Sequence, residues 1–242
     1  DFISEADWHE NRKLLRVEFP VALTMPEAVS DIAGGFLKRS THCNTSWEFA
    51  RFEAAAHRYF DLSETGYGVA LLNDCKYGYA VRKDALDLAL LRAPKSPDWD
   101  ADQAAHHFTY ALLPHQKMLV ASDVMAESAI LNRPPRCFDG FAGQFQLPCL
   151  LAWSDGVGIA AIKKAEKESA WIVRLVERRG AVSRAELALN GRFTVLETDL
   201  IEWTGIHQYP FSDRIALTLT PFEIKTLKLT PAKDGPRVEK YH

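Results

Sequence analysis

One stretch of the sequence, residues 66–79, gathers the side-chain types that recognise a sugar. It reads GYGVALLNDCKYGY, so an apolar run leads to Asn73, Asp74, Lys76 and Tyr77. Carboxylate and amide oxygens accept hydrogen bonds from sugar hydroxyls, an ammonium group donates them, and a tyrosine ring offers a flat face to C–H bonds. These residues are therefore candidate substrate-binding groups.

The same stretch also fits a plain turn between two strands. Asn and Asp side chains bond the neighbouring backbone and thereby favour turns. We expect an apolar strand to enter this polar tip and a second strand to leave it, as a hairpin. From the residues alone, a sugar-facing tip and a tip that only reverses the chain both remain open.

Two other patterns look like reactive sites but have structural interpretations. Gly156 and Gly158 match a degenerate dinucleotide fingerprint, which needs a helix after it. A strand and a charged turn follow instead, so we expect these glycines at the start of a hairpin. His106 and His107 are adjacent, and adjacent residues of a strand point to opposite faces, so we do not expect them to share a metal ion.

No motif for catalysis or metal binding is recognisable. The sequence contains no His-x-Asp, His-Glu-x-x-His, Gly-x-Ser-x-Gly or Cys-x-x-Cys pattern. We therefore name no catalytic residue and no metal ligand. The sequence has four cysteines, too few for a disulfide scaffold, and we expect buried, reduced thiols with a Cys43–Cys75 bridge as the alternative. They are Cys43, Cys75, Cys137 and Cys149.

A polar run at residues 39–47 is dense in hydrogen-bonding groups. It contains Asn44-Thr45-Ser46, formally a glycosylation acceptor, a triplet that is also common by chance. At the end of this run we expect Trp47 to be a core aromatic residue, with Arg51 as its cationic partner.

The composition is that of a globular protein. The chain has 242 residues, of which 47% are hydrophobic and 25% charged. With 29 Lys and Arg against 32 Asp and Glu, the net charge is −3, which argues against non-specific binding to nucleic-acid phosphates. No apolar run approaches the roughly 18 residues that span a membrane, and no signal-peptide pattern is present. Because the chain begins without methionine, we expect it to be a piece of a longer polypeptide.

Alternating apolar and polar residues predict strands over most of the chain. One hairpin is expected between residues 157–164 and 170–177, and another at Asn190-Gly191, a dipeptide that accepts positive φ. Helical spacing is limited to Ser122–Leu131, with Ser122 as the N-cap, whereas Trp47–Phe60 fits either a helix or a strand. Many short strands favour an all-β sandwich or barrel.

Proline and glycine mark two breaks in this pattern. Residues 93–102 are predicted to be an exposed loop, and a domain boundary is predicted between Asn132 and Pro148.

Several stretches together resemble the C-terminal β-sandwich region of glycoside hydrolase family 38, the α-mannosidases, in the bacterial and cytosolic-type branch. They occur in order along nearly the full chain, and the ordered set is more specific than any single match. The stretches are LLRVEFP at 14–20, THCNTSW at 41–47, ARFE at 50–53, AHRYFDLSE at 56–64, residues 66–79, FTYALLPH at 108–115 and PFEIKTL at 221–227.

The resemblance implies an all-β fold in two parts. Residues 1–138 would form a large antiparallel β-sandwich of the supersandwich, galactose-mutarotase-like type. Residues 139–242 would form a smaller β-sandwich-like subdomain.

The resemblance also implies a function, that of the C-terminal domain of a retaining, zinc-dependent exo-α-mannosidase. In that family the aspartate nucleophile and the zinc ligands lie in an upstream α/β barrel. We therefore expect zinc in the missing N-terminal domain, no cofactor in this chain and an inactive isolated fragment. The implied partners are that barrel and a mannose-containing oligosaccharide, without nucleic acid or membrane, and the implied location is cytoplasmic.

The resemblance gives the polar tip two roles, contact with the sugar or docking against the barrel. The corresponding tip of the Golgi-type branch carries an acidic residue and an arginine near the glycan. Here Lys76 offers a point charge in place of a planar guanidinium. Two other classes stay open for the whole chain, an autonomous carbohydrate-binding β-sandwich and a purely structural interaction domain.

Overall fold

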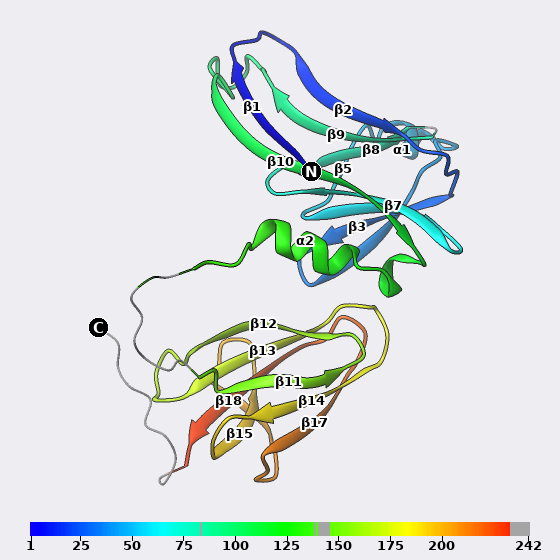
Figure 1. Ribbon diagram of the computed structural model, residues 1–242. Coiled ribbons are helices and arrows are strands. Elements are labelled where there is room, and N and C mark those ends of the chain that lie inside the picture. Colours follow the sequence, from blue (N-terminus) through cyan, green and yellow to red (C-terminus); the bar gives the residue numbers. More distant parts are fainter. Residues whose placement is uncertain (83, 138, 140–145, 233–242) are drawn as a thin grey trace. The chain divides into compact units, whose positions relative to one another are not determined.

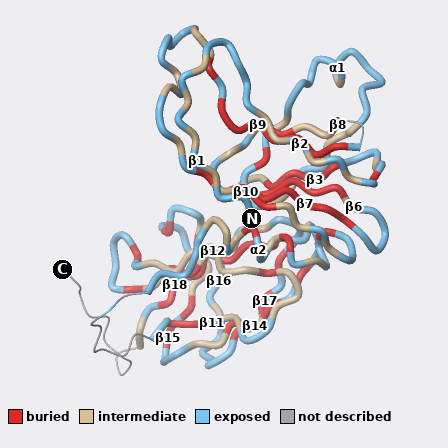
Figure 2. The backbone as a smooth tube through the Cα atoms, turned by 45° about the horizontal axis from the view of Figure 1, so that its top comes forward, coloured by how far each residue is buried: buried red, intermediate tan, exposed pale blue. Residues whose placement is uncertain are grey.

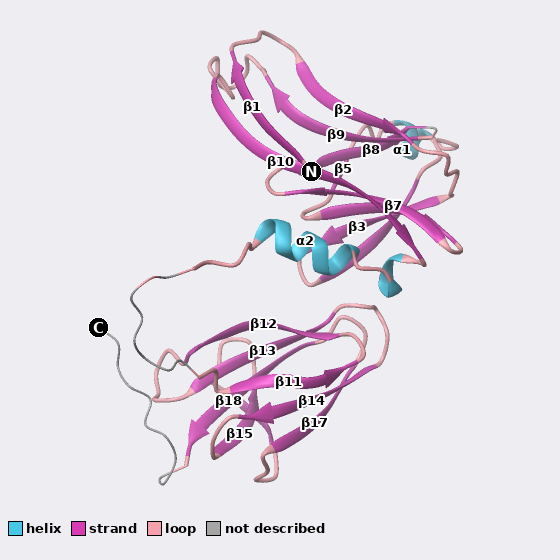
Figure 3. Cartoon of the chain, in the orientation of Figure 1, coloured by secondary structure: helices cyan, strands magenta, loops and turns pink. Residues whose placement is uncertain are grey.

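The computed structural model describes residues 1–82, 84–137, 139 and 146–232, and most of its regular structure is strand (Figure 3). The chain divides into two compact units, Asp1–Cys137 and Phe138–His242, here called the N-terminal and C-terminal units. Each unit contains two sheets, and every strand pairing within them is antiparallel. The predicted all-β class is confirmed.

The N-terminal unit is built from a six-stranded sheet, sheet A, and a four-stranded sheet, sheet B (Figure 1). In spatial order, sheet A contains β1 (Phe2–Trp8), β10 (Ala104–Gln116), β7 (Tyr67–Asn73), β6 (Tyr59–Glu64), β3 (Glu27–Ile32) and β4 (Gly35–Ser40). Sheet B contains β2 (Leu14–Pro20), β9 (Ala85–Arg92), β8 (Gly78–Arg82) and β5 (Ala54–Ala55).

Strand β7 is buried on both faces, which explains its uninterrupted apolar run. Val69 and Leu71 belong to the main core, which also includes residues of sheet B. Ala70 and Leu72 pack instead with the helical residues Leu119 and Val124. Figure 2 shows β6 and β7 as buried strands. The sequence pattern of this strand therefore reflects two packing layers.

The helices of the N-terminal unit are short. They are α1 (Ser46–Phe49), the 3₁₀ turn η1 (Leu119–Ala121) and α2 (Val124–Asn132). The predicted helix at Ser122–Leu131 is confirmed as α2, although its N-cap is Asp123, and Ser122 Oγ accepts from Val124 N at 3.3 Å.

The prediction that Trp47 is a core residue was wrong. Its side chain is 85% exposed, because α1 is a single turn that buries none of its residues. The polar run before it forms a capping box, in which Thr45 Oγ1 accepts from Glu48 N and Glu48 Oε2 accepts from Thr45 N.

The C-terminal unit is a second sandwich with its own core. Sheet C contains β11 (Cys149–Ser154), β14 (Ser183–Leu189) and β17 (Arg214–Leu219). Sheet D contains β12 (Val157–Lys164), β13 (Trp171–Glu177), β18 (Ile224–Pro231), β15 (Phe193–Thr198) and β16 (Gly205–Gln208). Inward residues of both sheets, such as Leu187 and Val195, meet in this core.

One of the two expected hairpins of this unit is confirmed. Strands β12 and β13 pair directly. The prediction of a hairpin at Asn190-Gly191 was wrong. Because β14 belongs to sheet C and β15 to sheet D, this dipeptide connects two sheets. Asn190 N donates to Pro148 O at 2.8 Å, and Gly191 has a φ of 128°. Alternation indicates which face is buried but not which strand lies alongside.

The other sequence expectations have mixed outcomes. A strand follows Gly156, as predicted, and the loop after β9 is largely exposed. The cysteines are all free, so there is no Cys43–Cys75 bridge, but only Cys149 is buried. The predicted boundary between Asn132 and Pro148 lies partly outside the described residues. Among the described helices, none is long and apolar enough to span a membrane.

Candidate functional site

The polar tip after β7 is a crossing between two sheets. Strand β7 pairs with β6 on one edge and β10 on the other, whereas β8 pairs with β9 and β5. The prediction that β7 and β8 form a hairpin was therefore wrong, because both edges of β7 are already paired with other strands. Residues 74–77, here called the crossing segment, lead from sheet A to sheet B (Figure 1).

Asn73 shapes the start of this segment. Its side chain is buried, and its Oδ1 accepts a hydrogen bond from Lys76 N at 2.8 Å. Its backbone carbonyl accepts from Asn132 Nδ2 of α2 at 2.9 Å. Its Nδ2 is buried without a hydrogen-bond partner among the described residues. The side chain of Asn73 thus supports the backbone of the crossing segment.

Asp74 joins the crossing segment to β10. Its Oδ2 accepts from Thr109 N at 2.9 Å, and its own N donates to Thr109 O at 3.1 Å. Its Oδ1 is buried and has no partner within the described part of the chain. Burial, followed by the hydrogen bond and charge of Asp74, raises the pKa of the neighbouring Cys75 to about 11, so this thiol is protonated at neutral pH.

Tyr77 is the exposed member of the predicted set, and Lys76 is partly buried. The Lys76 ammonium lies 4.5 Å from the ring centroid of Phe108. Tyr77 is 55% exposed, and its ring meets that of His57 edge-on at 6.0 Å. The structure thus brings all the predicted site residues into one segment, with Asn73 and Asp74 engaged by the backbone. Their contact with a sugar stays a prediction.

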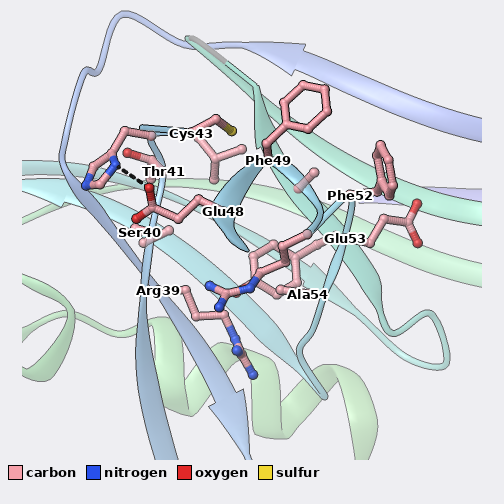
Figure 4. A pocket seen from close by; sticks show the side chains of 15 residues that line it. Arg39, Ser40, Thr41, Cys43, Glu48, Phe49, Phe52, Glu53 and Ala54 are labelled. Carbon is pink, nitrogen blue, oxygen red and sulfur yellow. Dashed lines mark ion pairs between the residues drawn. The ribbon is translucent and has the colours of Figure 1, made fainter. Parts of the chain in front are cut away.

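A pocket of about 240 Å³ lies beside strand β8, into which the crossing segment leads. Its wall includes Ala54 of β5, opposite Tyr79 in the ladder. Figure 4 shows Phe49 and Phe52 on one side of this pocket and Arg39 on another.

Two carboxylates at this pocket are already engaged. Besides its capping bonds, Glu48 Oε2 lies 3.2 Å from His42 Nδ1. Glu53 pairs with Arg16, and a Cβ at Gly78 would lie 2.9 Å from Glu53 Oε2, so the glycine permits this close approach. Partial burial opposes ionisation of Glu48. Hydrogen bonds to its carboxylate from the backbone of Thr45 and Asn44 and from the side chain of Ser40 outweigh this effect, so the pKa of the carboxyl group is lowered.

The sequence interpretation missed the two arginines of this pocket. It assigned Arg51 to Trp47 and gave Arg39 no role of its own, yet both guanidinium groups line the pocket around Tyr79. Burial raises the pKa of Tyr79 to about 12, while the charge and hydrogen bond of Arg39 and the charge of Arg51 oppose the rise. The only sequence signal was the density of polar residues at 39–47.

A buried hydrogen bond between a histidine and a carboxyl group across β7 was also missed. His115 Nε2 lies 2.7 Å from Asp61 Oδ1, and Asp61 is 1% exposed. Burial is the largest cause that raises the pKa of Asp61, and bonds from Ser63 and His115 oppose it. Gly68 permits the arrangement, because a side chain there would collide with the His115 ring. A charged residue between Phe60 and Leu62 was the signal available in the sequence.

Nothing in the described residues forms a metal centre. No group of three or more His, Cys, Asp or Glu side chains in that part of the chain is arranged to hold a metal ion. The donor set for zinc therefore does not fit any location that the structure describes.

Two family models match the chain. The model described as "Glycosyl hydrolases family 38 C-terminal domain" matches residues 1–100. The model described as "Glycosyl hydrolases family 38 C-terminal beta sandwich domain" matches residues 156–227. Together they cover well over half of the chain, with one match in each structural unit.

Curated relatives match the chain over nearly its whole length. Alpha-mannosidase 2C1 of Mus musculus is 41% identical over 239 residues, which cover 94% of this chain and 23% of the relative. Alpha-mannosidase G of Dictyostelium discoideum is 36% identical over 243 residues, covering 94% and 22%. An alpha-mannosidase of Saccharomyces cerevisiae is 32% identical over 256 residues, covering 92% and 23%. The chain spans about a quarter of the length of these relatives.

A solved structure shares the fold. The crystal structure of an alpha-mannosidase from Enterococcus faecalis V583 matches with a TM-score of 0.75 and 18% identity, over 94% of this chain and 27% of that chain. At this identity the likeness supports the fold, and it agrees with the predicted antiparallel β-sandwich.

Proposed function

The chain belongs to the C-terminal β-sandwich region of glycoside hydrolase family 38, and on this premise we propose that it is part of a retaining, zinc-dependent exo-α-mannosidase. The observation that carries the proposal is its match, over more than nine-tenths of its length, to relatives named α-mannosidases. Because the chain spans only about a quarter of those relatives, the nucleophile, the acid/base residue and the zinc are proposed to lie in an N-terminal barrel outside it. The isolated chain would then be inactive.

The proposed contribution of this chain to the reaction is to position the substrate. Lys76 would donate to a sugar oxygen, and Tyr77 would present its ring and hydroxyl group. Asn73 and Asp74 would hold these groups in place through the bonds to Lys76 N and Thr109 N. Groups held in a productive geometry lower the barrier without taking part in bond cleavage.

The proposed partner within the polypeptide is the catalytic barrel. Three aromatic side chains, Trp47, Phe49 and Phe52, are 85%, 70% and 70% exposed on and next to α1. Exposed apolar patches mark surfaces that another protein part covers. This aromatic group supports docking near α1. The proposal includes a mannose-containing oligosaccharide as substrate and the cytoplasmic location implied by the cytosolic-type branch.

Kinetics of the polypeptide encoded by the longest open reading frame that contains this chain would test the positioning role. Lys76→Ala and Tyr77→Ala should each lower kcat/KM for an α-mannoside by roughly 10- to 100-fold, the loss expected for a hydrogen bond to the reacting sugar. The melting temperature should change little. Tyr67→Ala, at the other end of β7 and 41% exposed, is the matched control and should leave kcat/KM unchanged. Unchanged kinetics with a lowered melting temperature would contradict substrate contact and favour a structural role.

One observation favours the second candidate, an autonomous carbohydrate-binding module. Trp203 of the C-terminal unit is 64% exposed beside a pocket of about 210 Å³ lined also by Glu168, Glu202 and Lys228. Exposed tryptophan rings next to carboxylates can stack on sugars. However, the Lys167 ammonium already lies 3.5 Å from the Trp203 ring centroid, which limits access to one face.

Calorimetric titration of mannose oligosaccharides into the chain separates the two candidates. Binding that Trp203→Ala abolishes, and that the control Trp153→Ala, at a tryptophan that is 54% exposed, retains, would favour the binding module. No binding by the chain, with hydrolysis by the longer polypeptide, would favour the mannosidase.

A further inference from the structure

The pocket beside β8 contains two positive charges that have no negative partner among the described residues. Here it is called the arginine pocket, and it lies between β4, α1 and β8, with Arg39 and Arg51 in its lining. Among the described residues, neither guanidinium group has a carboxylate within salt-bridge distance. The nearby Glu48 and Glu53 are engaged by His42 and Arg16.

Among the described residues, Arg39 is also short of one hydrogen-bond acceptor. Its Nε is buried and has no partner in the part of the chain that the structure describes. A buried donor without an acceptor is costly, and more so when it carries charge. An oxygen atom placed against Arg39 Nε would therefore be stabilised.

The side chains of Arg39 and Arg51 line the same pocket, and Tyr79 lines it with them. The charges of both arginines oppose the rise that burial causes in the pKa of the Tyr79 phenol. Like charges that share a partly buried space disfavour each other, and an anion between them removes that cost. The planar guanidinium fork also matches carboxylate and phosphate oxygens in geometry.

We propose that the arginine pocket binds an oxyanion, a carboxylate or phosphate group, between Arg39 and Arg51. Phe49 and Phe52, whose rings meet edge-on at 6.5 Å, form an apolar rim for the part of the ligand that carries the anion. This site lies apart from the sugar-contact role of the crossing segment, and it goes beyond the proposed function.

The size of the pocket limits the ligand. At about 240 Å³ it is smaller than the roughly 300–1,000 Å³ typical of drug-sized ligands. It suits a small free anion or a single acidic side chain. Two sources therefore share the required chemistry, a small carboxylate or phosphate compound and an Asp or Glu side chain from the polypeptide outside this chain.

The test is calorimetric titration of inorganic phosphate, and separately of acetate, into the chain at constant ionic strength. We expect saturable binding of at least one of the two anions. Arg51→Gln, which alters an exposed residue, should weaken it about tenfold or more, the effect of losing a charge-assisted hydrogen bond. Arg39→Gln should do the same, and the matched control Arg184→Gln, an exposed arginine of the C-terminal unit, should leave it unchanged.

The same titration of the longer polypeptide identifies the source. If the ligand is a free anion, the longer polypeptide binds phosphate or acetate as the chain does. If an acidic side chain fills the pocket, only the chain binds them, and Arg51→Gln lowers the melting temperature of the longer polypeptide. No saturable binding by the chain, or binding that both arginine substitutions leave unchanged, would overturn the proposal. Because no step of this test measures hydrolysis, its failure is distinct from a failure of the proposed function.

Discussion

One buried carboxylate of each unit, Glu177 and Asp61, lies in a contrasting environment. In the C-terminal unit, Glu177 accepts bonds from the backbone N of Arg179, Gly180 and Phe222 and from Ser183 Oγ, all at 2.8–2.9 Å. In the N-terminal unit, Asp61 has only the side chains of Ser63 and His115 as partners in the hydrogen bonds described. Burial opposes ionisation of both groups, but the many donors lower the pKa of Glu177, whereas that of Asp61 is raised.

Two of the connections between sheets, the ones predicted as hairpins, differ in the same direction. The Asn190-Gly191 crossing is tied to Pro148 O and Leu147 O by the backbone and side-chain nitrogens of Asn190. The crossing segment of the N-terminal unit is tied by Asn73 and Asp74, and it leaves the side chains of Lys76 and Tyr77 available. In these examples the C-terminal unit uses its polar groups to close its own turns, while the N-terminal unit retains polar groups that can meet a ligand.

The largest expected effect comes from removing the best-bonded carboxylate. Glu177→Ala leaves several buried donors without an acceptor, so it should lower the free energy of unfolding by roughly 3–5 kcal/mol. Urea unfolding followed by circular dichroism measures this loss. Glu186→Ala on β14, which removes an exposed ion pair with Arg214 of β17, is the control and should cost about 0.5 kcal/mol or less. A loss at Glu177 no larger than that of the control would remove the contrast between the units.

The pH dependence of stability should have opposite signs at the two buried acids. Because the pKa of Glu177 is lowered in the folded state, its carboxylate stabilises the fold at pH values above the unfolded pKa of about 4.3. This stabilisation is lost as the pH falls through the folded pKa. Because the pKa of Asp61 is raised in the folded state, its neutral carboxyl group favours the fold at pH values below the unfolded pKa of about 3.9. This contribution to stability is lost as the pH rises through the folded pKa.

Glu177→Gln and Asp61→Asn isolate these contributions, because each amide imitates the neutral acid. From pH 3 upwards, wild type should gain stability relative to Glu177→Gln and lose stability relative to Asp61→Asn. Urea unfolding at a series of pH values measures both differences. Slopes of the same sign would contradict the assignment of the two environments.

A smaller effect is expected at the two crossings. Asn73→Ala removes the acceptor of Lys76 N but also a buried Nδ2 without a partner, so the loss of stability should be about 1 kcal/mol. Asn190→Ala acts at an exposed side chain and should cost about 0.5 kcal/mol or less. Equal losses in thermal unfolding would show that the crossing segment is no more constrained by its side chains than the other crossing.

Sequence periodicity predicted the strands well but not their neighbours. The runs at 171–177 and 215–219 are β13 and β17, because alternation directly reports one buried face. Both predicted turns that proved to be crossings, after Asn73 and at Asn190, connect strands that bury side chains in one core from opposite sheets. A hairpin and a crossing produce the same local pattern, so only the pairing of other strands distinguishes them.

The candidate site was predictable only where it is local. Turn chemistry correctly indicated Asn73 as a group that bonds nearby backbone, since its acceptor oxygen and Lys76 N are three residues apart. Asp74 instead bonds Thr109 N of β10, which local turn chemistry does not predict. The arginine pocket depends on β4, α1 and β8 meeting in space, which brings together Arg39, Arg51 and Tyr79. No pattern within one segment contains that information.

The most direct test of the proposed function is an assay of α-mannoside hydrolysis by the purified 242-residue chain beside the longer polypeptide that contains it. We expect mannose release by the longer polypeptide and none by the chain alone at equal molar concentration. Hydrolysis by the chain itself, or none by the longer polypeptide with zinc supplied, would contradict the proposal that the cleaving centre lies in a separate part of an α-mannosidase.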